Sequence, residues 1–325
     1  MNSKLDTQAA QWLHEMSLQG QPSFTEMTAQ EVRESANRKS LERPVIREDV
    51  QQIQNLKVPI NSKDILVRVY QPVLDSLAPL LLYFHGGGWV AGSLDTHDPL
   101  CRALANSSGF VVVSVDYPLS PETKFPKALH EGYEVLQWLL SNGKSIKGNP
   151  DWIAVGGDSA GGNLAASLAL FAKREGDPSL KFQLLNYPIT DISNFDTASY
   201  EELADGYGLT KKQMQWYSEQ YLKNPKDGFN SLASPLLGED LAGLPAAHVT
   251  IAEFDVLRDE GQAYADKLKK AGVSVSSKFY PGMTHGFLGM LGIFDRTRIA
   301  IDDIAFSLRN AYQSTGNSNA ADKEK

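Results

Sequence analysis

A serine lies at the centre of a short glycine motif, Gly157-Asp158-Ser159-Ala160-Gly161, which has the pattern G-x-S-x-G. The apolar run Trp152–Val155 is expected to be a buried strand that leads into this motif, and Leu164–Ala172 a helix that leaves it. A strand, a tight turn and a helix with small flanking residues permit the strained turn that lifts a serine hydroxyl above a sheet. We therefore interpret Ser159 as a nucleophile, with a purely structural Gly/Ser turn as the alternative.

A histidine downstream of Ser159 is needed as a base, because a serine hydroxyl is a poor nucleophile until a neighbouring group takes its proton. Two candidates follow it, His248 and His285. His248 begins the run Val249–Ala252, at the N-terminal edge of a sheet, and we interpret it as a surface or strand-start residue. His285 follows the run Val273–Tyr280 and so lies at the C-terminal edge, where the sites of α/β sheets assemble. We predict His285 as the base.

The acidic partner of the histidine is expected between the serine and the histidine in the chain. Asp255 comes just beyond the predicted strand His248–Phe254 and before a helix that starts near Asp259. Its carboxylate can therefore face the loop that carries His285 and hold one imidazole tautomer. The alternative is that Asp255 only caps the helix.

A glycine-rich loop, His85-Gly86-Gly87-Gly88-Trp89, directly follows the apolar run Leu80–Phe84. Acyl hydrolysis passes through an oxyanion, which needs backbone N–H donors fixed in advance. The loop offers such donors, and Ala160, the residue after the serine, offers a further N–H. Phosphate binding is disfavoured, because no G-x-x-x-x-G-K-[ST] follows and no G-x-G-x-x-G opens a helix. We interpret His85 as a residue that orients the loop.

Short apolar runs alternate with helical stretches from residue 80 onward, and this alternation predicts a doubly wound α/β sheet with parallel central strands. Two earlier runs alternate apolar and polar residues and predict an antiparallel edge, Val50–Val58 and Asp64–Gln71. The expected central strands are Leu80–Phe84, Phe110–Val115, Trp152–Val155, Phe182–Leu185 and Val249–Ala252. The expected helices are about 97–107, 125–141, 160–174, 258–271 and 294–312.

Two segments outside this alternation are predicted to pack together as a helical cap. Residues 1–45 form a polar, helix-prone arm with a capping box at Thr28 and Glu31. Residues 188–245 form an insertion that is far longer than a usual strand-to-helix connection. The α/β domain is expected over 46–187 and 246–313, and a disordered tail over 314–325.

A second capping box, Thr210 and Gln213, opens a helix inside the insertion that carries Met214, Tyr217 and Tyr221 on one face. Met214 and Tyr217 could line a substrate pocket, and Trp89 beside the glycine loop could bound it. An equally good interpretation is that Met214, Tyr217 and Tyr221 only form the core of the cap.

The composition is that of an ordinary soluble protein, with 325 residues, 42% apolar and 22% charged. The net charge of −8 disfavours nucleic acid and anionic membrane as partners. The single cysteine, Cys101, excludes an internal disulfide, and His14, His97 and His130 stand singly without metal-ligand spacing. We predict no metal site. The absence of a signal-peptide core and of a long apolar stretch predicts a cytoplasmic location.

Five motifs, in order, resemble the hormone-sensitive-lipase family (family IV) of carboxylesterases, which has an α/β-hydrolase fold. They are HGGGWVAGS (85–93), DYPLSPETKFPKAL (116–129), GGDSAGGNLA (156–165), EFDVLRDEGQAYA (253–265) and YPGMTHGF (280–287), within a match over about 45–312. The resemblance implies a mostly parallel eight-stranded sheet, a cap built from the arm and the insertion, and hydrolysis of short- to medium-chain esters. It implies the triad Ser159, Asp255 and His285, and an oxyanion hole from the amides of Gly87, Gly88 and Ala160.

The leading hypothesis is thus a serine carboxylesterase that acts on a small-molecule ester through an acyl-enzyme, with no cofactor. An amidase or deacetylase with the same triad is the alternative within enzymes. A non-catalytic small-ligand receptor is the alternative outside them, and the intact His285 argues against it. A homodimer is left open.

Overall fold

The computed structural model describes residues 4–18, 26–61 and 63–321, and in these ranges eight strands form one sheet in the order β1-β2-β4-β3-β5-β6-β7-β8. β2 is antiparallel to β1 and β4, and the other neighbouring strands are parallel. The predicted mostly parallel sheet is confirmed. The strands are β1 Gln52–Pro59, β2 Asp64–Gln71, β3 Ala78–Phe84, β4 Val111–Val115, β5 Gly148–Asp158, β6 Leu180–Asn186, β7 Ala246–Phe254 and β8 Val275–Thr284.

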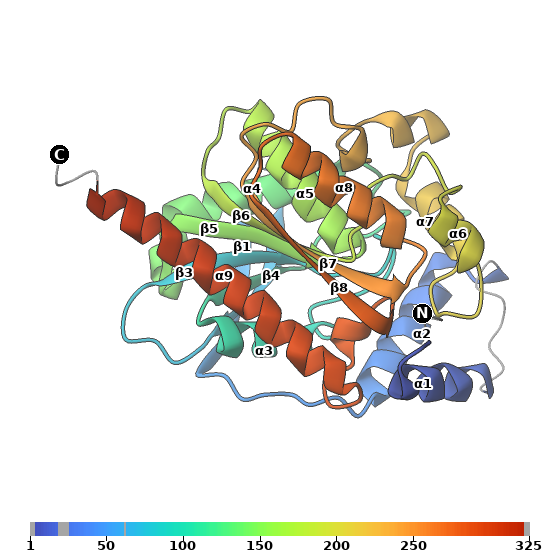
Figure 1. Cartoon of the computed structure of the whole chain (residues 1–325). Coiled ribbons are helices and arrows are strands. Elements are labelled where there is room, and N and C mark those ends of the chain that lie inside the picture. Colours follow the sequence, from blue (N-terminus) through green and yellow to red (C-terminus); the bar gives the residue numbers. More distant parts are fainter. Residues whose placement is uncertain (1–3, 19–25, 62, 322–325) are drawn as a thin grey trace.

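Helices cover both faces of the sheet (Figure 1). α3 (Asp98–Ser108) and α9 (Asp295–Ala321) lie on one face, and α4 (Lys127–Asn142), α5 (Ala160–Arg174) and α8 (Arg258–Lys270) lie on the other. Alternate side chains of β3 divide between the two, since Leu80 and Leu82 pack with α4 and α5 whereas Leu81 and Tyr83 pack with α3 and α9. Burial on both faces explains the continuous apolar run of this strand.

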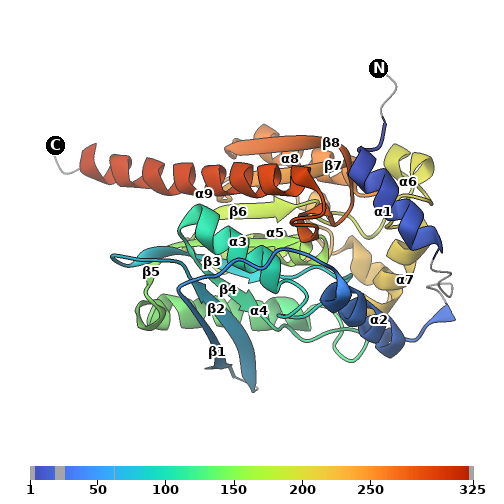
Figure 2. The same ribbon diagram turned by 90° about the horizontal axis from the view of Figure 1, so that it is seen from below.

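The N-terminal arm consists of α1 (Thr7–Leu18) and α2 (Ala29–Glu42), which lie near the C-terminal ends of the parallel strands (Figure 2). The predicted capping box is present, because the Thr28 backbone N–H donates to Glu31 and the Glu31 N–H donates to the Thr28 hydroxyl. Arg33 fastens α2 to the α/β domain, where its Nε donates to the Val90 carbonyl at 2.7 Å and its guanidinium pairs with Glu122.

The insertion divides into two parts. Its first part holds α6 (Ala198–Glu202) and α7 (Lys211–Tyr221), and these helices lie beside the arm in both views (Figures 1 and 2). Its second part holds two short 3₁₀ turns, η3 (Pro225–Phe229) and η4 (Pro235–Leu237), and packs on the α/β domain. There Asn163 of α5 donates to the Ala233 carbonyl at 2.9 Å, and Lys267 of α8 donates to the Leu236 carbonyl at 2.7 Å.

The last helix is longer than predicted. α9 continues to Ala321, beyond the predicted helix end near residue 312, while the disordered tail over 314–325 stays a prediction and residues 322–325 lie outside the described ranges. No proline interrupts this stretch, and extending a formed helix costs little compared with nucleating one. Among the described residues, the helices are either too short or too polar to cross a bilayer.

His248 lies inside β7 and is 3% exposed, so it is a strand residue as predicted but not a surface one. Its Nδ1 lies 2.8 Å from the Ser276 hydroxyl of β8 and 3.0 Å from the Ser307 hydroxyl of α9. Burial lowers the pKa of His248 to about 4, so the folded protein holds this imidazole neutral in mildly acidic solution.

The free energy of unfolding is expected to fall on acidification from about pH 6.5 to about pH 4 in part because of His248, since the unfolded chain then binds a proton that the folded chain excludes. One such group contributes at most about 1.4 kcal/mol per pH unit. Urea unfolding of His248→Gln should show a shallower slope in this window than wild type. His14→Gln, which changes an exposed histidine, is the control. Equal slopes for wild type and His248→Gln would contradict the assignment.

Candidate active site

Ser159 occupies the sharp turn between β5 and α5. Its backbone has φ 56° and ψ −120°, in the left-handed region of φ that residues with a Cβ rarely adopt. The turn is possible because its neighbours are small, since a Cβ on Gly161 would lie 1.9 Å from the Phe84 carbonyl oxygen. The Ser159 N–H donates to the Asn186 carbonyl at 2.9 Å, which ties the turn to β6. This local structure is the strand–turn–helix that the sequence predicts.

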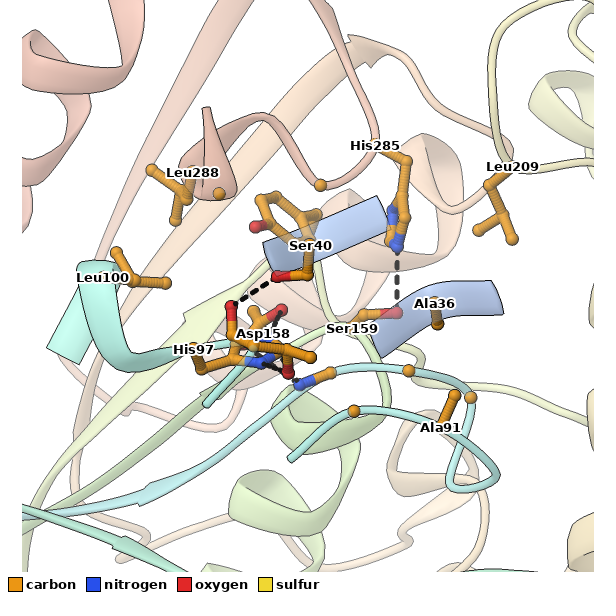
Figure 3. A pocket seen from close by; sticks show the side chains of 18 of the residues that line it. Ala36, Ser40, Ala91, His97, Leu100, Asp158, Ser159, Leu209, His285 and Leu288 are labelled. Carbon is orange, nitrogen blue, oxygen red and sulfur yellow. Dashed lines mark hydrogen bonds and ion pairs between the residues drawn. The ribbon is translucent and has the colours of Figure 1, made fainter. Parts of the chain in front are cut away.

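The structure brings Ser159, His285 and Asp255 together at the C-terminal edge of the sheet. The Nε2 atom of His285 lies 2.9 Å from the Ser159 Oγ, and its Nδ1 lies 2.7 Å from the Asp255 Oδ2. Asp255 follows β7 and His285 follows β8, so neighbouring parallel strands deliver both residues to one edge. Figure 3 shows the His285 ring directed at the Ser159 hydroxyl.

Buried contacts fix the orientation of Asp255 and His285. Asp255 is 2% exposed, and its Oδ1 accepts a hydrogen bond from the Leu257 N–H at 2.9 Å. The Tyr187 ring packs edge-on against His285, with 4.9 Å between the ring centroids. Because Asp255 Oδ2 accepts from Nδ1–H, the neutral imidazole presents an unprotonated Nε2 to the serine, and such a nitrogen can take the hydroxyl proton.

The glycine loop after β3 lies beside Ser159. Gly87 has φ 122° and Gly88 has φ 61°, and a Cβ on Gly87 would lie 2.2 Å from the Ala91 carbonyl oxygen. Val90 and Ala91 donate to the Gly87 carbonyl at 3.2 and 2.9 Å, which holds the turn. In the described part of the chain the amides of Gly87, Gly88 and Ala160 have no hydrogen-bond acceptor. They remain available to an oxyanion.

An aspartate inside the serine motif organises the same loop. The Oδ1 atom of Asp158 accepts hydrogen bonds from the Tyr83 hydroxyl at 2.8 Å and from the Gly86 N–H at 3.2 Å, and its Oδ2 lies 3.2 Å from the His97 Nε2. Burial alone would raise the pKa of Asp158, but the charge of His97 and the hydrogen bonds from His97 and Tyr83 lower it. An ionised Asp158 can therefore anchor the glycine loop through the Gly86 N–H.

His97 and Tyr83 were not identified from the sequence, where His97 stands singly. Their contact with Asp158 depends on how the chain crosses from β3 to α3. The one feature of the sequence that could have pointed to this contact is the aspartate inside the glycine motif.

His85 has the predicted geometry, since its Nδ1 lies 2.9 Å from the Gly86 oxygen and its ring stacks on Tyr117 at 4.3 Å. Burial lowers the pKa of His85 to about 3, so this ring is neutral.

A cavity of about 250 Å³ opens over Ser159. Its wall includes Leu100, Leu209, Leu288 and Leu291, side chains of α2, and Tyr217 of α7. Figure 3 shows Ala36 and Ser40 of α2 close to the serine, with His97 and Asp158 on the side of the glycine loop. Within the described residues no group of three or more His, Cys, Asp or Glu side chains has an arrangement that could hold a metal ion.

Of the three residues predicted to line a substrate pocket, only Tyr217 lines this cavity. Trp89 is 1% exposed and stacks on Tyr221 with 4.2 Å between the ring centroids, and Met214 is also 1% exposed. Trp89 and Met214 therefore do not line this cavity in the structure, and their substrate-binding role stays a prediction from the sequence. Trp89 has a positive φ of 60°, and its ring packs against α7 through Tyr221.

Comparison with known proteins identifies the family of the chain. A family model described as the alpha/beta hydrolase fold matches residues 81–289. The carboxylic ester hydrolase LipN of Mycobacterium tuberculosis is 38% identical over 263 residues, which are 79% of this chain and 70% of LipN. The ethyl acetate hydrolase of Pseudomonas putida is 40% identical over 234 residues, which are 70% of this chain and 73% of that protein.

Comparison with a solved structure also shows similarity to an esterase. The hyperthermophilic esterase of the archaeon Pyrobaculum calidifontis has a TM-score of 0.89 and 38% identity, over 94% of this chain and 98% of that one. The chain belongs to the alpha/beta hydrolase family, in its hormone-sensitive-lipase-like branch of carboxylesterases. The predicted family and fold are confirmed.

Proposed function

We propose that the protein is a serine carboxylesterase that hydrolyses short- to medium-chain esters through an acyl-enzyme formed on Ser159. The observation that carries the assignment is the continuous hydrogen-bonded chain from Asp255 through His285 to the Ser159 hydroxyl at the floor of a cavity. The general class of activity, carboxylic ester hydrolysis, agrees with the names of the relatives and is confirmed by them. The roles of the individual residues and the preferred acyl-chain length of the substrate are our proposals.

In the acylation step, His285 Nε2 takes the proton of Ser159 as its oxygen attacks the ester carbonyl. The amides of Gly87, Gly88 and Ala160 donate to the oxyanion that forms. His285 then gives the proton to the alkoxy oxygen, and the alcohol leaves the acyl-enzyme. In deacylation a water loses its proton to His285, attacks the acyl carbon, and releases the acid as Ser159 recovers its proton. Asp255 stabilises the imidazolium in both steps.

Ester and amide substrates share this chemistry, and the amidase or deacetylase alternative is tested with a matched pair. Hydrolysis of p-nitrophenyl acetate well above that of 4-nitroacetanilide supports an esterase, and the reverse order supports an amidase. The receptor alternative is disfavoured by the contact between His285 and Ser159.

The rate series of p-nitrophenyl esters from C2 to C16 is expected to rise and then fall, with kcat/KM highest at about two to eight carbons. Each buried methylene of the acyl chain gains about 0.8 kcal/mol until the cavity ends.

Tyr217→Ala should move the maximum to longer acyl chains because Tyr217 lines the cavity and packs against Gly88. Met214→Ala, in the same helix but buried in the core, is the matched comparison and should lower Tm without moving the maximum. A maximum at C12 or beyond for wild type would refute the short-chain proposal.

The arm and the first part of the insertion are proposed to act together as the cap, since both lie over the strand ends that carry the site (Figure 2). The domain boundaries, the cytoplasmic location and a homodimer stay predictions from the sequence.

A further inference from the structure

The wall of the cavity over Ser159 contains an arginine, Arg43, at the end of α2. Ala36, Ser40 and Arg43 follow one another at helical spacing, so they share the face of α2 that lines this cavity. Within the described residues, Arg43 is the only lysine or arginine in the wall. Its guanidinium is always charged at neutral pH.

Arg43 lacks an anionic partner in the described part of the chain. Its Nε is buried and has no hydrogen-bond acceptor, and its Nη1 lies 3.4 Å from the Gly289 carbonyl oxygen, at the long end of the hydrogen-bonding range. The guanidinium lies over the Trp12 ring at 5.5 Å from the centroid. Burial lowers the pKa of Arg43, and no carboxylate opposes that effect.

Most of the other partly buried arginines in the described chain pair with carboxylates, whereas Arg309 donates to the Ser107 carbonyl. Arg33 pairs with Glu122, Arg68 with Asp95 at 2.7 Å, and Arg258 with Glu202 at 3.0 Å. A charge removed from water is costly unless an opposite charge compensates it. The partial desolvation of Arg43 is therefore not offset within the described protein, whereas that of the other three is.

The groups that face Arg43 leave room for an external anion. Lys39, one turn earlier on α2, adds positive charge. Among the described residues of the wall the only carboxylate is Asp158, and it is already bound to Tyr83, Gly86 and His97. Arg43 approaches Gly289, a few residues after His285, so its charge and the reacting serine belong to one cavity.

We propose that the preferred substrate carries a carboxylate apart from the scissile ester and that Arg43 binds this carboxylate. The inference rests on the proposed esterase function and deepens it. Two substrate classes share this chemistry: monoesters of dicarboxylic acids, with the charge on the acyl side, and acyloxy acids, with the charge on the alcohol side. The contrary explanation is that Arg43 only stabilises the helix end, through the α2 dipole and the Trp12 ring.

Matched pairs of esters separate these explanations. Monomethyl adipate and methyl hexanoate differ by a terminal carboxylate in place of a methyl group on the acyl side. The pair 4-acetoxybutanoate and butyl acetate differs in the same way on the alcohol side. For each pair the ratio of kcat/KM, anionic over neutral, is measured for wild type, Arg43→Gln, Arg43→Lys and Arg38→Gln.

We expect Arg43→Gln to lower this ratio about 10- to 100-fold in one pair, because a charge-assisted hydrogen bond is lost. Arg43→Lys should lower it less, because the charge remains but the planar fork is lost. Arg38→Gln removes the same charge from an exposed position outside the cavity wall and should keep the wild-type ratio. A merely structural role would lower kcat/KM for both members of a pair alike.

An unchanged ratio in both pairs for Arg43→Gln overturns the inference. If that variant fails to fold, the wild-type ratio between about 20 and 500 mM NaCl decides, since an ion pair at the cavity mouth weakens with salt. If the wild-type ratio of kcat/KM, anionic over neutral, is below one in both pairs and does not change with salt, the inference is overturned. Failure of wild type to hydrolyse the neutral esters would instead refute the proposed function itself.

Discussion

Ser159→Ala is expected to lower kcat about 10⁶-fold, the loss found when a nucleophile of this kind is removed. Without the hydroxyl no acyl-enzyme forms, although the oxyanion donors and the cavity remain. The variant should fold normally, because alanine, like serine, has a Cβ and meets the φ of 56° with the same strain. Steady-state hydrolysis of p-nitrophenyl butyrate and the Tm from circular dichroism measure the two effects separately.

Ser167→Ala is the matched control, since Ser167 is a buried serine of α5 that does not line the cavity. It should keep wild-type turnover. If Ser159→Ala retained more than a few per cent of the wild-type kcat with an unchanged Tm, Ser159 would not be the nucleophile.

Asp255→Asn is expected to lower kcat about 10⁴-fold, as a related change does in another serine hydrolase. The Asn side chain can turn its N–H₂ toward His285 Nδ1, which favours the tautomer with a proton on Nε2. That tautomer cannot accept the Ser159 proton. The single Asn oxygen then occupies the Oδ1 position and can still accept from the Leu257 N–H, so the loop should hold its shape.

Single-turnover measurement of the acylation burst tests this result directly, because the tautomer acts before the acyl-enzyme forms. Asp266→Asn, on the surface of α8, removes one negative charge away from His285. It therefore controls for the effect of the net charge on the rate. A loss below tenfold in Asp255→Asn would show that another group orients His285.

Much of the site could be predicted from the sequence because its parts are local or bound to chain order. The residues around Ser159 predict the tight turn directly, because only glycine fits at positions such as Gly161. Asp255 and His285 could be chosen because parallel strands deliver the residues after them to one edge. The alternation of apolar runs and helices predicted the layers of the fold for the same reason, since a strand covered on both faces must be apolar throughout.

The order of the motifs along the chain is thus enough to predict which backbone segments meet at the strand ends and which functional groups they carry. Which side chains face the cavity depends instead on how the helices pack in three dimensions. Tyr217 and Met214 lie three residues apart on α7, yet one lines the cavity and the other is buried, because the rotation of α7 is set by the surfaces it packs against. Arg43 reaches the cavity and His97 reaches Asp158 through contacts between distant segments, and no local spacing encodes such contacts.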